Sequence, residues 1–256
     1  MIHPTAVIDA SAELAADVDI GPYSIIGPGV TIGARTEVGP HVVIQGPTRI
    51  GEDNRIHQFA SLGDAPQDKK YAGEPTRLEI GDRNTIREFV TFNRGTVQDE
   101  GLTRIGDDNW IMAYVHIAHD CRVGNQTILA NNASMAGHVT VGDYAILGGF
   151  TLIHQFCVIG AHSLTAFGSG ISKDVPPYVM VGGSPARAHG LNMEGLRRRG
   201  FPEGARRQLK DAYRMLYREN LSLQDALARL RETAGECDEV GLLVDFLETQ
   251  TRGIVR

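Results

Sequence analysis

The stretch IGPYSIIGPGVTIGARTEVGPHVVIQGPTRIG, residues 20–51, carries an aliphatic residue at every sixth position. The same register runs over residues 2–62 and returns at residues 80–86, and after a shift of one residue it continues over residues 105–171 with one slip at Thr165. A period of six fits neither an α-helix, which repeats about every 3.6 residues, nor an alternating strand. It is typical of a hexapeptide β-helix, in which each hexad forms one short strand and one corner. The sequence therefore predicts a mainly β protein, a left-handed parallel β-helix with its aliphatic side chains stacked inside.

Two interruptions and one boundary organise the chain. Residues 64–79 (DAPQDKKYAGEPTRLE) and residues 95–104 break the register, and a solenoid accepts such insertions only as loops at its corners. We expect the β-helix to span residues 1–187 with these two corner loops. Residues 188–256 are expected to form a small α-helical domain that caps the open end of the β-helix.

The expected cap contains three helical segments. Apolar and basic residues at helical spacing predict one helix over residues 202–219. Ser222, with Asp225 three residues later, predicts the N-cap of a second helix. A third helix is expected over residues 238–251.

Composition and charge exclude several classes of function. The formal net charge of −6 argues against a nucleic-acid partner. No run of about 18 apolar residues and no signal peptide are present, so we expect no membrane insertion. Cys121, Cys157 and Cys237 are odd in number and form no CxxC pair, which indicates free thiols in a reducing, cytoplasmic compartment.

Histidines are concentrated in the second half of the repeats. Residues 18 apart lie one coil above each other, so His138 is expected about one coil from the His119–Asp120 pair, and His154 near the same edge. We expect the group to gather on or near one vertical edge of the prism, although solvated corner residues are the plain alternative. The group comprises His116, His119, Asp120, His138, His154 and His162.

Two kinds of site fit such a group. Imidazoles bind Zn²⁺, and gamma-type carbonic anhydrases use hexapeptide histidines in this way, but no histidine pair here has their five-residue spacing, so we predict no metal. General-base catalysis is the second. A carboxylate at Asp120 can hold the imidazole of His119 in one tautomer, and its free nitrogen can then accept a proton from a substrate hydroxyl.

Several motifs carry a resemblance to one family. They are IAHDC (residues 117–121), NNA (131–133), AGHV (136–139), IHQFC (153–157), QDKKYAGEPTR (67–77), NMEGLRRRGF (192–201) and TRGIVR (251–256). Together they resemble the UDP-N-acetylglucosamine O-acyltransferases of lipid A biosynthesis, and the likeness covers the chain from end to end. The loop motif and the entry to the cap are specific to that family, whereas the hexads alone indicate only the fold.

The resemblance implies an activity and its partners. A (3R)-hydroxyacyl chain would pass from acyl carrier protein to the glucosamine 3-hydroxyl of UDP-N-acetylglucosamine. The enzyme would be a homotrimer with active sites between neighbouring prisms, and it would need no cofactor beyond the carrier's phosphopantetheine.

It also implies roles for individual residues. His119 would be the general base, Asp120 its orienting carboxylate, and the Gly137 N–H the oxyanion donor. Asp68 and Lys70 would hold the sugar and the acyl 3-hydroxyl. The cleft would be lined by His116, His138, His154 and Gln155, and the nucleotide contacts would be Asn192, Glu194, Arg198 and Arg199.

Two positions make this chain distinctive within the resemblance. Asn93 stands where the family usually has His at the sugar site, so we consider either a neutral replacement or tolerance of a 3-amino sugar. Phe167 falls at the position that measures the acyl chain. A ring there predicts a shorter chain of about ten to twelve carbons, unless it turns away from the groove.

Three other functions remain to be weighed. The related N-acyltransferase of the same pathway and the hexapeptide nucleotidyltransferases carry an extra domain before the prism, whereas the hexads here begin at Ile2. A non-catalytic scaffold is the alternative from a different class. It predicts that His119→Ala leaves ligand binding and activity untouched.

Overall fold

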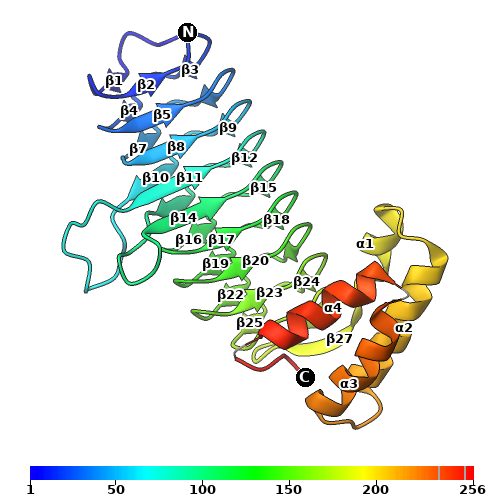
Figure 1. Cartoon of the computed structure of the whole chain (residues 1–256). Helices are drawn as coiled ribbons and strands as arrows, with labels where there is room; N and C mark the ends of the chain where they lie inside the picture. Colours follow the sequence, from blue (N-terminus) through cyan, green and yellow to red (C-terminus); the bar gives the residue numbers. More distant parts are fainter. Residues whose placement is uncertain (236, 251) are drawn as a thin grey trace.

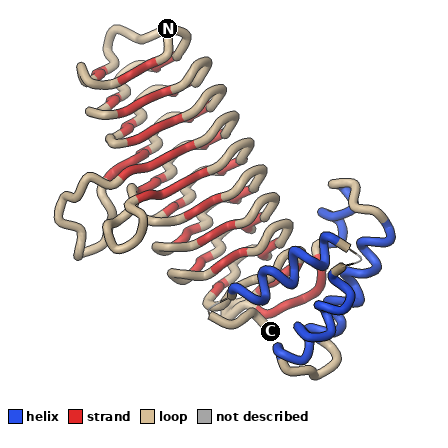
Figure 2. Tube along the Cα trace, viewed as in Figure 1, coloured by secondary structure: helices blue, strands red, loops and turns tan. Residues whose placement is uncertain are grey.

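The structure is a computed structural model that describes residues 1–235, 237–250 and 252–256. Short strands follow one another around a triangular prism, and coils stack along its axis (Figures 1 and 2). The predicted left-handed parallel β-helix is confirmed, with helices gathered at its C-terminal end.

Three sheets form the faces of the prism, and their strands are parallel except for β27 at the end of the third. The first sheet, in spatial order, contains β1 (Val7–Ile8), β4 (Ile25–Ile26), β7 (Val43–Ile44), β10 (Ser61–Asp64), β13 (Thr91–Asn93), β16 (His116–Ile117), β19 (Ser134–Met135), β22 (Leu152–Ile153) and β25 (Gly170–Ile171). The second contains β2 (Glu13–Leu14), β5 (Val30–Ile32), β8 (Thr48–Ile50), β11 (Arg77–Ile80), β14 (Leu102–Ile105), β17 (Arg122–Val123), β20 (Thr140–Val141) and β23 (Val158–Ile159). The third contains β3 (Asp19–Ile20), β6 (Glu37–Val38), β9 (Arg55–Ile56), β12 (Thr85–Ile86), β15 (Trp110–Ile111), β18 (Ile128–Leu129), β21 (Ile146–Leu147), β24 (Leu164–Thr165), β26 (Val179–Gly182) and β27 (Arg187–Leu191).

The hexad residues form the core. Ile26 pairs with Ile44 and Ile44 with Leu62, and each of these side chains is at most 1% exposed. Thr165, the one slip in the register, is also buried, and its hydroxyl forms a 2.7 Å hydrogen bond with the hydroxyl of Thr151. A polar residue is tolerated there because it has a partner.

The three edges of the prism differ in what they carry. The loop edge joins the first sheet to the second and bears both insertions, which form loops over residues 65–76 and 94–101 (Figure 1). The charged edge joins the second sheet to the third and begins with pairs such as Arg35–Asp53 and Arg83–Asp108. The aromatic edge joins the third sheet to the first and carries a column of stacked rings that starts at Tyr23.

Four helices follow the repeats within the described residues: α1 (Met193–Arg198), α2 (Glu203–Tyr217), α3 (Leu223–Ala234) and α4 (Asp238–Thr249). The Ser222 side chain accepts a hydrogen bond from Asp225 N, which confirms the predicted N-cap. The predicted end of the last helix, Thr251, lies outside the described residues. None of the helices in the described part of the chain is long and apolar enough to cross a membrane.

The junction between prism and helices contains structure that the hexads do not predict. β27 pairs antiparallel with β26, so a hairpin crosses the proposed division between residues 187 and 188. Asp174 forms backbone hydrogen bonds with Gly253 and Val255, and the Val255 side chain is buried in the prism core. The end of the chain thus closes the last coil.

Candidate active site

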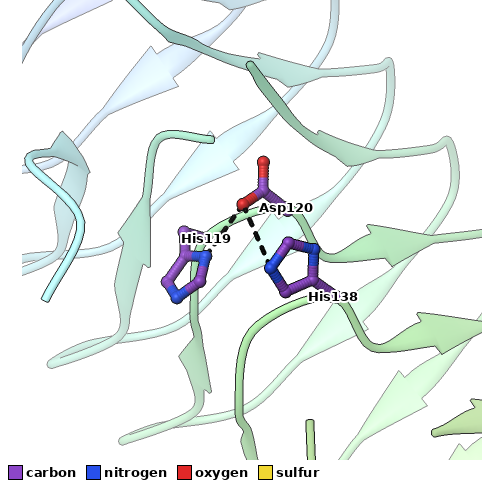
Figure 3. A group of neighbouring side chains, drawn as sticks. All are labelled: His119, Asp120 and His138. Carbon is purple, nitrogen blue, oxygen red and sulfur yellow. Dashed lines mark hydrogen bonds and ion pairs between the residues drawn. The ribbon is translucent and has the colours of Figure 1, made fainter. Parts of the chain in front are cut away.

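Two turns on neighbouring coils of the loop edge bring His119, Asp120 and His138 together (Figure 3). One turn joins β16 to β17 and the other joins β19 to β20, and the His138 N–H donates to the His119 carbonyl over 3.0 Å. His119 Nδ1 lies 2.8 Å from Asp120 Oδ2. The two imidazole rings meet edge to face, with centroids 5.2 Å apart.

Asp120 is a buried carboxylate with a full set of donors. The Thr96 N–H donates to Oδ1 over 2.7 Å, and the Thr96 hydroxyl donates to Oδ2 over 2.6 Å. The Asp120 N–H in turn donates to the Thr103 hydroxyl. Burial alone would raise the pKa of Asp120, but the hydrogen bonds from His119 and Thr96 outweigh it and hold the pKa below its usual value. Asp120 therefore accepts a hydrogen bond from His119 as a charged group.

This bond determines which nitrogen of His119 is available. A carboxylate only accepts, so Nδ1 of His119 carries the proton and donates it to Asp120. Nε2 is left for an incoming group. The His119 side chain is 17% exposed, which is enough for it to be reached from the cleft beside it.

Gly137 lies directly against His119. A Cβ added to Gly137 would touch Cε1 of His119 and lie 2.7 Å from Nε2, so no other residue fits here unless the ring moves. Gly137 occupies the same position within its corner as Pro22 and Pro40 do in corners of the aromatic edge. Proline has no backbone N–H, so a corner of this kind forms without an N–H at that position. In the described part of the chain, the Gly137 N–H has no acceptor among the backbone groups.

His138 is held from two sides. Its Nδ1 lies 3.0 Å from Asp99 Oδ2, in the second loop. Its ring stacks on Phe156, one coil further on, at 4.4 Å between centroids. Its Nε2 lies 3.7 Å from Asp120 Oδ2, so the carboxylate of Asp120 faces both histidines.

The two loops enclose a cleft next to these groups. It has a volume of about 640 Å³ and is lined by Asp68 and Lys70 of the first loop, Asp99 of the second, and His119, His138 and Gln155 of the prism. The Lys70 N–H donates to the Asp68 carboxylate, which shapes the tip of the first loop. The structure therefore brings together catalytic and sugar-site candidates that are far apart in sequence.

A second, more apolar cavity of about 770 Å³ lies on the outer face of the first sheet. Its lining includes His116, Leu152, His154 and Ile171. His116 Nδ1 lies 2.7 Å from the Thr91 hydroxyl, and burial lowers the pKa of this histidine. His116 on β16 and His154, at the start of the loop-edge turn after β22, thus line this cavity and not the loop cleft.

The expectation that the histidines share one edge is wrong for His162. His162 lies on the charged edge, stacked between Tyr144 and Tyr178. It follows His138 by 24 residues, which is one 18-residue coil plus one further hexad, and that extra hexad carries the chain to the next corner.

The four nucleotide-contact candidates are absent from the described linings of both cavities. Asn192 is buried, caps α1 and donates from Nδ2 to the His162 carbonyl. Glu194 accepts hydrogen bonds from Arg197 and Arg198, which lower its pKa to about 2. Arg199 donates to the Tyr144 carbonyl and lies over the Tyr144 ring.

Asn93 and Phe167 also lie outside the described linings of these cavities. Asn93 is 5% exposed and donates from Nδ2 to the Ala65 carbonyl, so it ties the start of the first loop to the prism. Its Oδ1 is buried without a partner among the described residues. Phe167 is 76% exposed on the aromatic edge, edge to face with Phe150.

Sequence reasoning missed Thr96, Thr103 and Asp99. Thr96 contacts Asp120 across 24 residues, and Asp99 contacts His138 across 39. Hexad arithmetic applies only inside the repeats and gives no position for a loop residue. The only signal was the polar character of the second insertion.

The same three side chains are the described group with metal-ligating atoms close together, all within 4.8 Å. A metal ligated by Asp120 would compete with the donors from Thr96 and His119 that already surround this carboxylate. The geometry favours a hydrogen-bonded pair beside a second imidazole. The absence of a metal stays a prediction.

Comparison with known proteins assigns the family. Residues 174–255 match the family described as "Udp N-acetylglucosamine O-acyltransferase; Domain 2", and residues 1–34 and 102–137 match the bacterial transferase hexapeptide repeats. An acyl-[acyl-carrier-protein]–UDP-N-acetylglucosamine O-acyltransferase of Thiobacillus denitrificans is 63% identical over 255 residues, covering 100% of this chain and 99% of that protein. The corresponding protein of Verminephrobacter eiseniae is 60% identical with the same coverage.

Solved structures agree with this assignment. The UDP-N-acetylglucosamine O-acyltransferase of Moraxella catarrhalis has a TM-score of 0.98 at 50% identity, covering 100% of this chain and 99% of that one. The UDP-N-acetylglucosamine acyltransferase of Francisella novicida has a TM-score of 0.98 at 43% identity, with 100% and 94% covered. This chain therefore belongs to the UDP-N-acetylglucosamine O-acyltransferase family and is an acyltransferase.

Proposed function

We propose that this chain transfers a (3R)-hydroxyacyl group from acyl carrier protein to the glucosamine 3-hydroxyl of UDP-N-acetylglucosamine. This reaction would be the first step of lipid A biosynthesis and would take place in the cytoplasm. The names of its relatives include both substrates. The observation that carries the proposal is the His119–Asp120 pair beside the unused N–H of Gly137, at the mouth of a cleft between two loops.

The reaction follows from the roles of three residues. Nε2 of His119 takes the proton of the 3-hydroxyl as its oxygen attacks the thioester carbonyl, and Asp120 stabilises the imidazolium that forms. The Gly137 N–H donates to the oxyanion of the tetrahedral intermediate. Collapse of the intermediate forms the ester and expels the phosphopantetheine thiolate, which recovers the proton from His119. No covalent enzyme intermediate, metal or cofactor takes part.

The two cavities suggest where the substrates bind. Asp68 and Lys70 would hold the sugar and the acyl 3-hydroxyl in the loop cleft, with His138 and Gln155 beside them. His116 and His154 would line the apolar cavity on the first sheet, which suits the acyl chain and the pantetheine arm. The polar cleft and the apolar cavity thus divide the two substrates between them.

A homotrimer accounts for the remaining candidates. Asn192, Glu194, Arg198 and Arg199 on and around α1, and Phe167 on the aromatic edge, stand apart from the cleft of their own chain. In an assembly with active sites between prisms, a neighbouring copy would supply them. Arg198 and Phe167 are exposed and could reach a partner's cleft, whereas Asn192 and Arg199 are already packed within their own chain.

Asn93 would either replace the family's histidine without effect or change the sugar preference. Its buried and unpartnered Oδ1 could accept a hydrogen bond from a ligand amine or hydroxyl, provided that the first loop opens. Rates on the 3-hydroxy and the 3-amino nucleotide sugars, measured for the parent protein and Asn93→His, address this directly. A strong preference of the parent for the hydroxyl sugar would end the idea of 3-amino tolerance.

The experiment that tests the function is a direct assay. Purified protein is incubated with UDP-N-acetylglucosamine and a series of 3-hydroxyacyl carrier proteins, and the acylated sugar is measured. Absence of product at every chain length would overturn the proposed reaction. A scaffold role would be supported if His119→Ala kept all ligand binding and no activity were found in either protein.

A further inference from the structure

The carboxylate of Asp99 forms a hydrogen bond with His138, the second histidine of the site. Asp99 Oδ2 lies 3.0 Å from Nδ1 of His138, and the two residues come from different elements, the second loop and the β19–β20 turn. We propose that Asp99 is a positioning residue for the acyl transfer, which holds His138 away from Asp120 and so reserves Asp120 for the general base. This inference rests on the proposed function.

The competition that Asp99 prevents is visible in the distances. Oδ2 of Asp120 is 2.8 Å from Nδ1 of His119 and 3.7 Å from Nε2 of His138. A shift of about 1 Å would bring His138 within hydrogen-bond distance of the same oxygen. While Asp99 accepts from Nδ1, the Nε2 of a neutral His138 has no proton to donate; without Asp99 the proton can move to Nε2, which would then donate to Asp120. That oxygen already accepts from Thr96, so this further donor would weaken the bond that orients His119.

The bond to Asp99 fixes the orientation of the His138 ring. Because a carboxylate only accepts, Nδ1 of His138 carries a proton and donates it. Phe156 stacks on one face of the ring at an interplanar angle of 13°, which permits rotation of the ring within its own plane but not tilting. Asp99 supplies the in-plane constraint that stacking lacks.

Asp99 is itself held in place. Its N–H donates to the Thr96 carbonyl, and its Oδ1 accepts from the Glu100 N–H. Arg122 on β17 lies 3.8 Å from Oδ1 and forms a 2.8 Å ion pair with Glu100. Thr96 therefore anchors the loop to Asp120 at one point, and Asp99 anchors it to His138 at another.

The variants that test this are Asp99→Ala and Asp99→Asn, with Glu100→Ala as the control. Glu100 offers a carboxylate from the same loop that reaches Arg122 and not His138. We expect Asp99→Ala to lower kcat about tenfold with little change in KM for the nucleotide sugar, because the loss acts on the orientation of the base. Asn keeps an acceptor for the Nδ1 proton, so Asp99→Asn should recover most of the activity.

Two further measurements separate positioning from a general loss of structure. In a His138→Ala background, Asp99→Ala should cause no additional loss, because its effect passes through His138. Nitrogen-15 spectra of the imidazoles should show His138 protonated at Nδ1 in the parent and Asp99→Asn proteins, and changed in Asp99→Ala.

Three results would overturn the role of Asp99: equal losses in the Asn and Ala variants, a loss that persists without His138, or His138 signals that ignore the substitution. A parent protein inactive with these substrates would instead overturn the proposed function. The imidazole spectra would still decide whether Asp99 positions His138.

Discussion

The loop edge and the aromatic edge of the prism have the same type of backbone corner but carry different side chains. Corners on both edges place a residue at positive φ, as at His138 (φ 63°) on the loop edge and His41 (φ 57°) on the aromatic edge. On the aromatic edge these residues form an unbroken stack of rings, with centroids 4.8 to 5.3 Å apart: Tyr23, His41, Phe59, Phe89 and Tyr114. On the loop edge the stack is reduced to His138 on Phe156, and carboxylates surround the histidines.

The comparison teaches where chemistry arises in a repeat protein. His41 lies between two aromatic rings, whereas His119 and His138 each have a carboxylate partner. Those partners depend on the insertion, because Thr96 and Asp99 come from the second loop. The repeat supplies the corner with its histidines and Asp120, and the insertion supplies the side chains that hold Asp120 and His138 in place.

The largest expected difference between the two edges is the effect on kcat of removing a histidine from each. His119→Ala should lower kcat by about a thousandfold, since general-base catalysis contributes roughly 10²–10⁴. His41→Ala, a corner histidine on the aromatic edge, should leave kcat close to that of the parent. The measurement is steady-state acyl transfer by both variants at saturating substrates. Similar losses in both would show that histidine removal acts through the fold and not through the chemistry.

The next contrast uses two glycines in the same corner position, Gly137 and Gly149. Gly137→Ala should lower kcat about a hundredfold, because the new Cβ would collide with the His119 ring and displace both the base and the neighbouring N–H. At Gly149 the nearest atoms to a new Cβ are 3.3 and 3.4 Å away, so Gly149→Ala needs only a small adjustment. If the two variants retained equal activity, close packing against His119 would not matter for turnover.

The third contrast concerns Phe167, which lies edge to face with Phe150 on the aromatic edge, beyond the stack that ends at Tyr114. If its ring limits the acyl groove of a neighbouring copy, Phe167→Gly should move the optimum from about ten to twelve carbons toward longer chains. Each additional buried methylene favours binding by about 0.8 kcal/mol, roughly fourfold. A series of acyl carrier protein thioesters measures the optimum for both proteins. An unchanged optimum, or a parent that already prefers the longest chains, would remove Phe167 from the acyl site.

The sequence predicted the parts of this molecule that depend on local period. The hexads determined the coil, the stacking of residues such as Ile26 on Ile44, and the proximity of His138 to His119, because inside the repeats a sequence distance translates directly into position. Ser222 was predicted as a cap for the same reason, since capping is decided within one turn.

The hexad spacing could not predict the other contacts of the site or the junction with the helices. The Thr96 donors to Asp120 and the Asp99 acceptor for His138 come from a loop whose path depends on its own hydrogen bonds, such as Gly101 N–H to the Thr96 carbonyl. The β26–β27 hairpin follows the point where the register ends, and no periodic signal marks it. His162 was misplaced because residues one hexad apart occupy the same position within a corner but lie at different edges.

The smallest expected effect concerns stability on the charged edge, where the half-buried His162 is stacked between Tyr144 and Tyr178, as His41 is stacked between rings on the aromatic edge. Burial, and to a lesser degree the charge of Arg199, lower the pKa of His162 from 6.5 to about 4, although Asp143 opposes this shift. Between these two values the unfolded chain binds a proton that the folded protein excludes, so the free energy of unfolding falls as the pH drops from about 6.5 toward 4. Above that window His162 is neutral in both states and does not make the free energy of unfolding depend on pH.

His162→Gln cannot take the proton, so its melting temperature should fall less than that of the parent between pH 7 and pH 5. Thermal unfolding at one protein concentration measures this, and parallel pH dependences for the two proteins would show that His162 does not exclude the proton.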